Sequence, residues 1–250
     1  MPELPFSLHY SVQGEGPTWV FLHGFLESST MWDYLPLDNL PVQQICIDLP
    51  GHGWSFELLT TPSIELMALE VQRVLDHLAI SSFSVVGHSM GGYVGLELSK
   101  MKGFEHLVLL NSNCWADSEQ KKHDRLRVAQ IVQNAKDIFI REAIPHLFRN
   151  ASANNAAISK LIDEAKHLSA DAIAQSTLAM RERTDFTDFV NAHPEKFTFI
   201  HGIHDRLVSV EELQQKVPNA HIHLLDSGHM SHIEASEEVL RILARSISND

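Results

Sequence analysis

The segment from Phe83 to Gly92 constrains the fold more than any other part of the chain. Its apolar run Phe83-Ser-Val-Val86 is typical of a buried strand, and Gly87-His-Ser-Met-Gly-Gly92 follows directly, before a helical pattern begins. The G-x-S-x-G spacing predicts a sharp strand–turn–helix with Ser89 at its apex and glycines where chain segments crowd together. Because short matches also occur in turns without chemistry, the rest of the sequence must decide its meaning.

Strand and helix patterns alternate on both sides of this segment. We expect strands at 6–12 (an edge strand), 18–22, 44–49, 83–86, 107–110, 197–200 and 221–225, and helices at 63–79, 90–101, 209–216 and 235–247. This alternation predicts an α/β fold with a mostly parallel central sheet and helices on both faces.

The middle of the chain has a different pattern. Between about 117 and 190 the apolar residues recur at helical spacing with no convincing strand, and the small polar run 150–157 predicts a loop. Residues 112–195 carry 11 Lys or Arg and 12 Asp or Glu, although the whole chain has a formal net charge of −13. We therefore predict an α/β core at 1–111 and 194–250, interrupted by a helical insertion at 112–193.

Composition excludes several classes of function. The net charge of −13 argues against a nucleic-acid partner, because phosphate binding needs a cationic face. No apolar run has the roughly 18–20 residues that span a membrane, and the first residues lack a signal sequence. Two cysteines, Cys46 and Cys114, cannot build a disulfide framework. We expect a cytoplasmic protein that does not bind membranes, and the sequence leaves its oligomeric state open.

A serine nucleophile needs a neighbouring base and an acid that orients the base. Asp205 follows the predicted strand 197–200 and His229 follows the predicted strand 221–225, which gives the chain order serine, acid, histidine. The carboxyl ends of parallel strands meet at one edge of a sheet, so the three side chains are predicted to form a catalytic triad. Asp205 could instead be a plain turn residue, and His232 competes with His229.

Backbone amides must also stabilise the oxyanion of acyl transfer. The amides of Phe25 and Met90 are predicted to form this oxyanion hole, the first in a loop after a buried strand and the second directly after Ser89. Candidate substrate contacts are His23, Gly24, His88 and Trp115. The close histidine pairs 201/204, 221/223 and 229/232 lack a metal-binding pattern, so we expect no metal and no cofactor.

Together these segments resemble the α/β-hydrolase superfamily. The resemblance rests on Phe-Leu-His-Gly-Phe at 21–25, Asp-Leu-Pro-Gly-His-Gly at 48–53, Gly-His-Ser-Met-Gly-Gly at 87–92, Asp205 and Gly-His at 228–229. It implies that 112–193 is the family's helical cap and that the 48–53 turn is structural. With serine at position 89 the chain resembles the branch of the superfamily that has a serine nucleophile. Epoxide hydrolases and haloalkane dehalogenases of the superfamily carry aspartate at that position.

The resemblance favours a carboxylesterase-like serine hydrolase that acts on a small or medium ester. One alternative is a carbon–carbon lyase, because the Phe-Leu-His-Gly-Phe-Leu start is similar to that of the menaquinone-pathway succinyl-hydroxycyclohexadiene-carboxylate synthases. The insertion holds six arginines that could bind a polyanion, but His88 and Tyr93 stand where that lyase typically has tyrosine and arginine. Another alternative is a non-catalytic ligand-binding protein that kept the fold.

Overall fold

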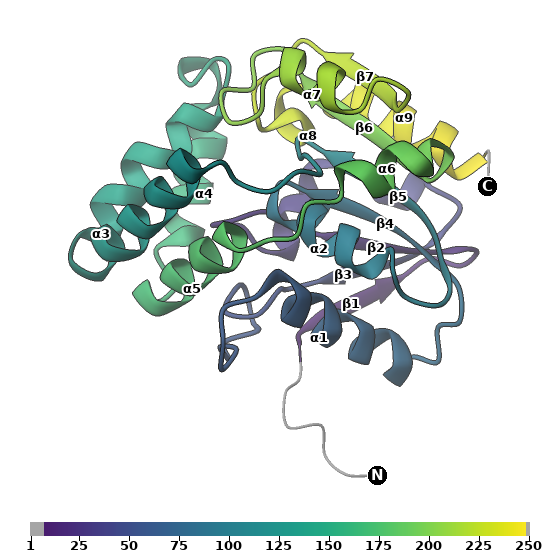
Figure 1. Ribbon diagram of the computed structural model, residues 1–250, viewed down its shortest axis with the longest axis horizontal. Coiled ribbons are helices and arrows are strands. Elements are labelled where there is room, and N and C mark those ends of the chain that lie inside the picture. Colours follow the sequence, from purple (N-terminus) through teal and green to yellow (C-terminus); the bar gives the residue numbers. More distant parts are fainter. Residues whose placement is uncertain (1–7, 249–250) are drawn as a thin grey trace.

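The computed structural model describes residues 8–248, and a seven-stranded sheet lies at its centre (Figure 1). The strand order is β1-β3-β2-β4-β5-β6-β7, in which β1 is antiparallel to β3 and all other neighbours are parallel. The strands are β1 (Tyr10–Gln13), β2 (Thr18–Leu22), β3 (Gln43–Ile47), β4 (Phe83–His88), β5 (Phe104–Leu110), β6 (Phe197–Gly202) and β7 (His221–Leu225). All seven fall within or overlap the predicted strands, and residues 6 and 7 of the predicted edge strand lie outside the described part.

Helices cover both faces of this sheet, as the alternation predicted. One face carries α1 (Ile64–His77), α2 (Met90–Leu98) and α7 (Val210–Lys216), whose apolar side chains share one core with β2, β4 and β5. The opposite face carries α9 (Ser236–Ser248) and the short helix Ser29–Tyr34, which share a second core with alternate residues of the same strands. Every residue of β4 is buried, since the strand lies in the middle of the sheet with helices on both sides.

The segment between β5 and β6 contains helices and no strand within the described residues. It comprises α3 (Glu119–Ala143), α4 (Asn155–Ala165), α5 (Ala170–Arg181) and α6 (Thr187–Ala192). The first three lie together at the left of Figure 1, beside the sheet rather than on its faces, and form a core of their own. The end of α5 and the start of α6 pack into the core of the sheet instead, through Ala179 and Met180 and through Phe186 and Val190.

The predicted loop at 150–157 is wrong in its second half. A single 3-10 turn covers Ser152–Asn154, and α4 begins at Asn155. Ile158 and Leu161 bury the inner face of α4 in the core of the helical segment, so tertiary packing extends the helix into a stretch of small residues with weak apolar periodicity.

A helix that crosses a membrane must be both long and apolar, and no helix within residues 8–248 meets both conditions.

Candidate active site

Ser89 lies in a sharp turn between β4 and α2. Its backbone has φ 49° and ψ −111°, which is left-handed territory that costs a side-chain-bearing residue about 1–3 kcal/mol. The turn is held because the Ser89 amide donates to the Leu110 carbonyl at 3.0 Å and the Ser112 hydroxyl donates to the Ser89 carbonyl at 2.8 Å. A methyl group at Gly91 would overlap the carbonyl oxygen of Leu22, so glycine is needed where the turn crosses the end of β2.

A continuous chain of hydrogen bonds joins Ser89, His229 and Asp205. His229 Nε2 lies 2.9 Å from Ser89 Oγ, and His229 Nδ1 lies 2.8 Å from Asp205 Oδ2. The serine follows β4, the acid follows β6 and the histidine follows β7, so the three side chains meet beyond the carboxyl ends of parallel strands. The structure thus brings together the three residues that the sequence predicted.

Asp205 is fixed from several sides. Its Oδ1 accepts the Leu207 amide at 2.8 Å, and its Oδ2 accepts Asn111 Nδ2 at 3.1 Å as well as His229. Burial alone would raise the pKa of this carboxyl, but the charge and hydrogen bond of His229 outweigh burial and hold the pKa well below its ordinary value. Asp205 is therefore an ionised acceptor that can keep His229 in one orientation.

Asn111 is a site residue that sequence reasoning missed. It is fully buried at the end of β5 with φ 46°, a conformation that asparagine tolerates better than most residues. Its Nδ2 bridges Asp205 Oδ2 and the Gly228 carbonyl, which lies 3.0 Å away. The only signal in the sequence was an asparagine at the end of a predicted strand.

The main chain of His229 is held at both of its polar groups. Its amide donates to the Leu147 carbonyl at 2.8 Å, and its carbonyl accepts His88 Nε2 at 3.0 Å. The first bond comes from the helical segment and the second from the residue before Ser89. The histidine loop is consequently tied to both parts of the molecule that surround it.

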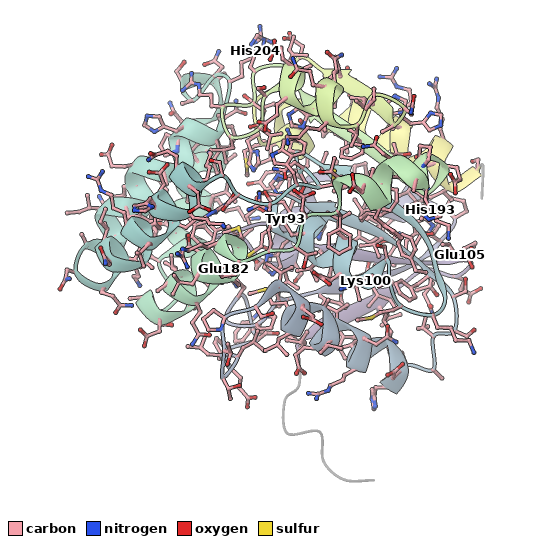
Figure 2. All side chains as sticks on the ribbon, viewed as in Figure 1. Tyr93, Lys100, Glu105, Glu182, His193 and His204 are labelled. Atoms are coloured by element: carbon pink, nitrogen blue, oxygen red, sulfur yellow. The ribbon has the colours of Figure 1, made fainter. Side chains whose placement is uncertain are left out.

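These groups open into a cavity of about 600 Å³ between the sheet and the helical segment. Phe25, Leu26, Val128, Phe139, Ala143 and Leu147 form its apolar lining. Tyr93, which Figure 2 shows near the centre of the molecule, lines a more polar side together with Asn113, Asp117, Lys121, Arg125 and Arg183. The size is that of sites for small molecules.

The predicted substrate contacts differ in where they lie. Trp115 and His88 line the cavity, but both ring nitrogens of His88 are occupied by protein groups. His23 and Gly24 are not among the lining residues: His23 bonds the Gly24 carbonyl and the Leu49 amide, so its ring supports the loop.

Of the two predicted oxyanion donors, Phe25 lines the same cavity as Ser89, and Met90 directly follows Ser89 in the chain. Met90 is the first residue of α2, where an amide has no acceptor within its own helix.

The cationic groups of the cavity are partly neutralised. Asp117 pairs with Arg183 Nη1 at 2.5 Å and with Arg125 Nε at 3.0 Å. Arg183 also donates to the Trp115 and Met180 carbonyls and stacks 4.3 Å from the centre of the Tyr93 ring. Arg183 is thus largely committed to protein partners, and one net positive charge remains on the group of three.

Within residues 8–248, no group of three or more His, Cys, Asp or Glu side chains is placed to hold a metal ion.

Comparison with known proteins places the chain in a family. Residues 19–242 match the model of the alpha/beta hydrolase family, so the chain belongs to this family. A solved esterase from Thermogutta terrifontis superposes with a TM-score of 0.88 at 25% identity, over 97% of this chain and 93% of that one. The family and this likeness support an enzyme with hydrolase chemistry.

Two curated relatives carry other names. The chain is 25% identical to a 2-succinyl-6-hydroxy-2,4-cyclohexadiene-1-carboxylate synthase from Enterobacter, over 92% of this chain and 91% of that protein. It is 28% identical to a dihydrolipoyllysine-residue acetyltransferase component of an acetoin cleaving system from Pseudomonas putida, over 92% of this chain. That match spans only 63% of the longer relative.

Proposed function

We propose that the protein is a serine hydrolase that cleaves small or medium carboxylic esters through an acyl-enzyme. The observation that carries this proposal is the hydrogen-bonded chain from Ser89 Oγ through His229 to Asp205, with distances of 2.9 and 2.8 Å, at the wall of a cavity of about 600 Å³. Such a chain supplies a base that can activate a serine hydroxyl near neutral pH.

In the proposed acylation, Ser89 Oγ attacks the ester carbonyl carbon while its proton passes to His229 Nε2. The tetrahedral intermediate collapses, the bond to the alcohol oxygen breaks, and His229 returns the proton to the leaving alcohol. Water then attacks the acyl-enzyme, giving its proton to His229, and the proton returns to Ser89 as the acid leaves. Asp205 stays ionised throughout and stabilises the charged imidazole.

The amides of Phe25 and Met90 are the proposed donors to the oxyanion. Phe25 belongs to the loop after β2 and Met90 to the first turn of α2, and Phe25 lines the cavity that also holds Ser89. The macrodipole of α2 favours negative charge at the same place, because Met90 is its first residue. The acyl group is assigned to the apolar lining around Phe25 and Phe139, whose ring centres are 6.5 Å apart.

Hydrolysis of p-nitrophenyl acetate and butyrate by the wild type and by Ser89→Ala tests this proposal. We expect turnover by the wild type and a loss of about 10⁴-fold or more in the variant, because the covalent route disappears. Ser82→Ala, which removes an exposed hydroxyl bonded to Glu105 at the other end of β4, is the control and should retain wild-type activity. Equal turnover by Ser89→Ala and wild type would overturn the mechanism.

A second candidate is a carbon–carbon lyase that acts on an anionic substrate. It is favoured by the named synthase relative and by Arg125, whose side chain lines the cavity and is only partly engaged by Asp117. The commitment of Arg183 to Asp117 and to two carbonyls weighs against it. Release of pyruvate together with the 2-succinyl-6-hydroxy-2,4-cyclohexadiene-1-carboxylate for which that synthase is named, with no ester turnover, would favour the lyase over the esterase.

A further inference from the structure

A buried glutamate and a buried histidine face each other at the wall of the proposed active-site cavity. Glu27 Oε2 lies 2.7 Å from His88 Nδ1, and the two side chains are 4% and 2% exposed. A charged group this deeply buried is costly unless it is paired and hydrogen-bonded. The proposed mechanism gives neither side chain a part in the chemistry, so their burial together needs another explanation.

The bonds around this pair indicate its protonation state. His88 Nε2 faces the His229 carbonyl at 3.0 Å, and a carbonyl oxygen can only accept. Glu27 Oε2 already accepts the Gly24 amide at 2.8 Å, as an ionised carboxylate does. Both ring nitrogens of His88 therefore face oxygen atoms that can accept a hydrogen bond, which is the arrangement of an imidazolium beside a carboxylate.

The electrostatics agree with this geometry. Burial would raise the pKa of Glu27, but the charge and hydrogen bond of His88 lower it to about 2. Burial would lower the pKa of His88, yet Glu27 outweighs burial and raises it. His232 Nε2, which lies 3.8 Å from Glu27 Oε1, has a pKa lowered to about 3, so this neighbour is neutral and adds no second positive charge.

Each partner of the pair belongs to a different part of the proposed machinery. The Gly24 amide lies in the loop that presents Phe25, His88 directly precedes Ser89, and the His229 carbonyl belongs to the base. A methyl group at Gly24 would lie 2.7 Å from His88 Nδ1, so this loop is packed directly onto the pair. We propose that Glu27 and His88 form a buried ion pair that positions the oxyanion loop and the base around Ser89.

Glu27 and His88 are positioning residues in this proposal, which rests on the proposed function of Ser89. The substitution Glu27→Gln removes the negative charge of the pair and keeps nearly the same side-chain shape. The amide oxygen can replace Oε2, and the NH₂ group can occupy the place of Oε1, which has no hydrogen-bond partner within the described residues. A neutral His88 would keep its proton on Nδ1 and turn an unprotonated Nε2 toward the His229 carbonyl, so that contact becomes repulsive.

The first measurement compares ester turnover by Glu27→Gln and wild type. We expect kcat to fall about 10- to 100-fold with KM changed by less than about twofold, because a misplaced base slows the chemical step and not binding. Glu97→Gln is the matched control: Glu97 is also a buried carboxylate paired with a cation, Lys100, but at the far end of α2. It should retain wild-type kcat.

The second measurement determines the charge of His88 from the ¹⁵N chemical shifts of its ring at pH 7, just above the ordinary histidine pKa of 6.5, with the signals assigned by their loss in His88→Gln. Two protonated nitrogens in the wild type and one in Glu27→Gln are expected. A neutral His88 in the wild type, or a folded Glu27→Gln with wild-type kcat, would overturn the proposal. If the wild type shows no ester turnover, the proposed function fails, whereas the shifts still test the ion pair.

Discussion

At the scale of single residues, Ser89 is held in an unfavourable backbone conformation by contacts from its neighbours. Its φ of 49° is maintained by bonds to Leu110 and Ser112 and by the close approach of Gly91 to β2. The same turn lifts Oγ to the position where His229 Nε2 is 2.9 Å away. The strained backbone of Ser89 therefore goes together with a hydroxyl held within hydrogen-bond distance of His229.

Asp205→Asn should lower kcat by about 10³- to 10⁴-fold with little change in KM. The Leu207 amide donates to Oδ1, so the carbonyl oxygen of the new amide is expected to remain there. Its NH₂ group then faces His229 Nδ1 and cannot accept the proton that this nitrogen must hold, which forces the wrong tautomer on the ring. Steady-state kinetics on p-nitrophenyl butyrate check this.

The control for this variant is Asp226→Asn. Asp226 is an exposed carboxylate paired with Arg149 and His204, away from the proposed nucleophile, and its loss should leave kcat unchanged. Similar losses in both variants would contradict the role given to Asp205.

The ion pair of Glu27 and His88 predicts a pH dependence of stability. Glu27 has a pKa lowered from 4.5 to about 2, so its stabilisation is present above about pH 4.5 and is lost as the pH falls toward 2. His88 has a pKa raised above 6.5, so its stabilisation is present below pH 6.5 and is lost as the pH rises through that higher value. Both contributions to stability, from Glu27 and from His88, are therefore fully present between about pH 4.5 and 6.5.

Urea unfolding of the wild type and Glu27→Gln over a pH series measures this effect. The difference between their free energies of unfolding should be largest between about pH 4.5 and 6.5 and shrink on both sides. The neighbouring titratable groups His23, His232 and Asp205 are common to both proteins and largely cancel in the difference. A difference that is constant with pH would show that no ion pair stabilises the fold.

The sequence predicted some site residues and missed others for a physical reason. Ser89 and His229 stand in short glycine-containing turns after strands, which are local patterns, and the order of the strands places Asp205 beside them. Glu27 has no such pattern, because its partner His88 is 61 residues away and only folding makes the carboxylate a buried one. The partners of His23 were also not predictable from local patterns, because its ring bonds the carbonyl of Gly24 and the amide of Leu49, which is 26 residues away.

At the scale of elements, the crossing of β2 and α2 limits what the turn tolerates. Gly91→Ala would place a methyl group against backbone, overlapping the Leu22 carbonyl and 2.7 Å from the His23 carbonyl. We expect the free energy of unfolding to fall by about 3 kcal/mol or more, because two main-chain segments must move apart.

Gly95→Ala, one turn further along α2, is the matched control in urea unfolding. Its methyl group would meet the end of the Leu107 side chain at 2.6 Å, which can move, and alanine favours the helix by about 1 kcal/mol. We expect a net change within about 1 kcal/mol. Equal losses in both variants would contradict a backbone clash specific to the turn.

Element types were predictable where the apolar period was strong. Ser63 caps α1 by accepting the Leu66 amide at 3.2 Å, close to the predicted start of that helix. The start of α4 was not predictable, because Asn155, Ala156 and Ala157 carry no apolar pattern. Packing of Ile158 and Leu161 against the rest of the helical segment determines it.

At the scale of the whole molecule, the cavity lies between two parts with separate cores. The sheet and its helices supply Ser89, His229 and Asp205, while α3 and α5 cover them from the other side (Figure 1). Leu26 and Met230, from the loops beside the serine and the histidine, belong to the core of the helical segment. The two parts therefore share residues where they meet, and α6 packs on the sheet. The proposed segment 112–193 is thus continuous in the sequence, but some of its side chains pack into the core of the sheet.

Covalent labelling by a fluorophosphonate probe, followed by peptide mass spectrometry, tests whether Ser89 is the nucleophile. We expect one adduct per molecule, on Ser89, in the native wild type, and none in Ser89→Ala or after denaturation. A folded wild type that forms no adduct, or forms it at another residue, would contradict Ser89 as the nucleophile and favour a ligand-binding protein on the same fold.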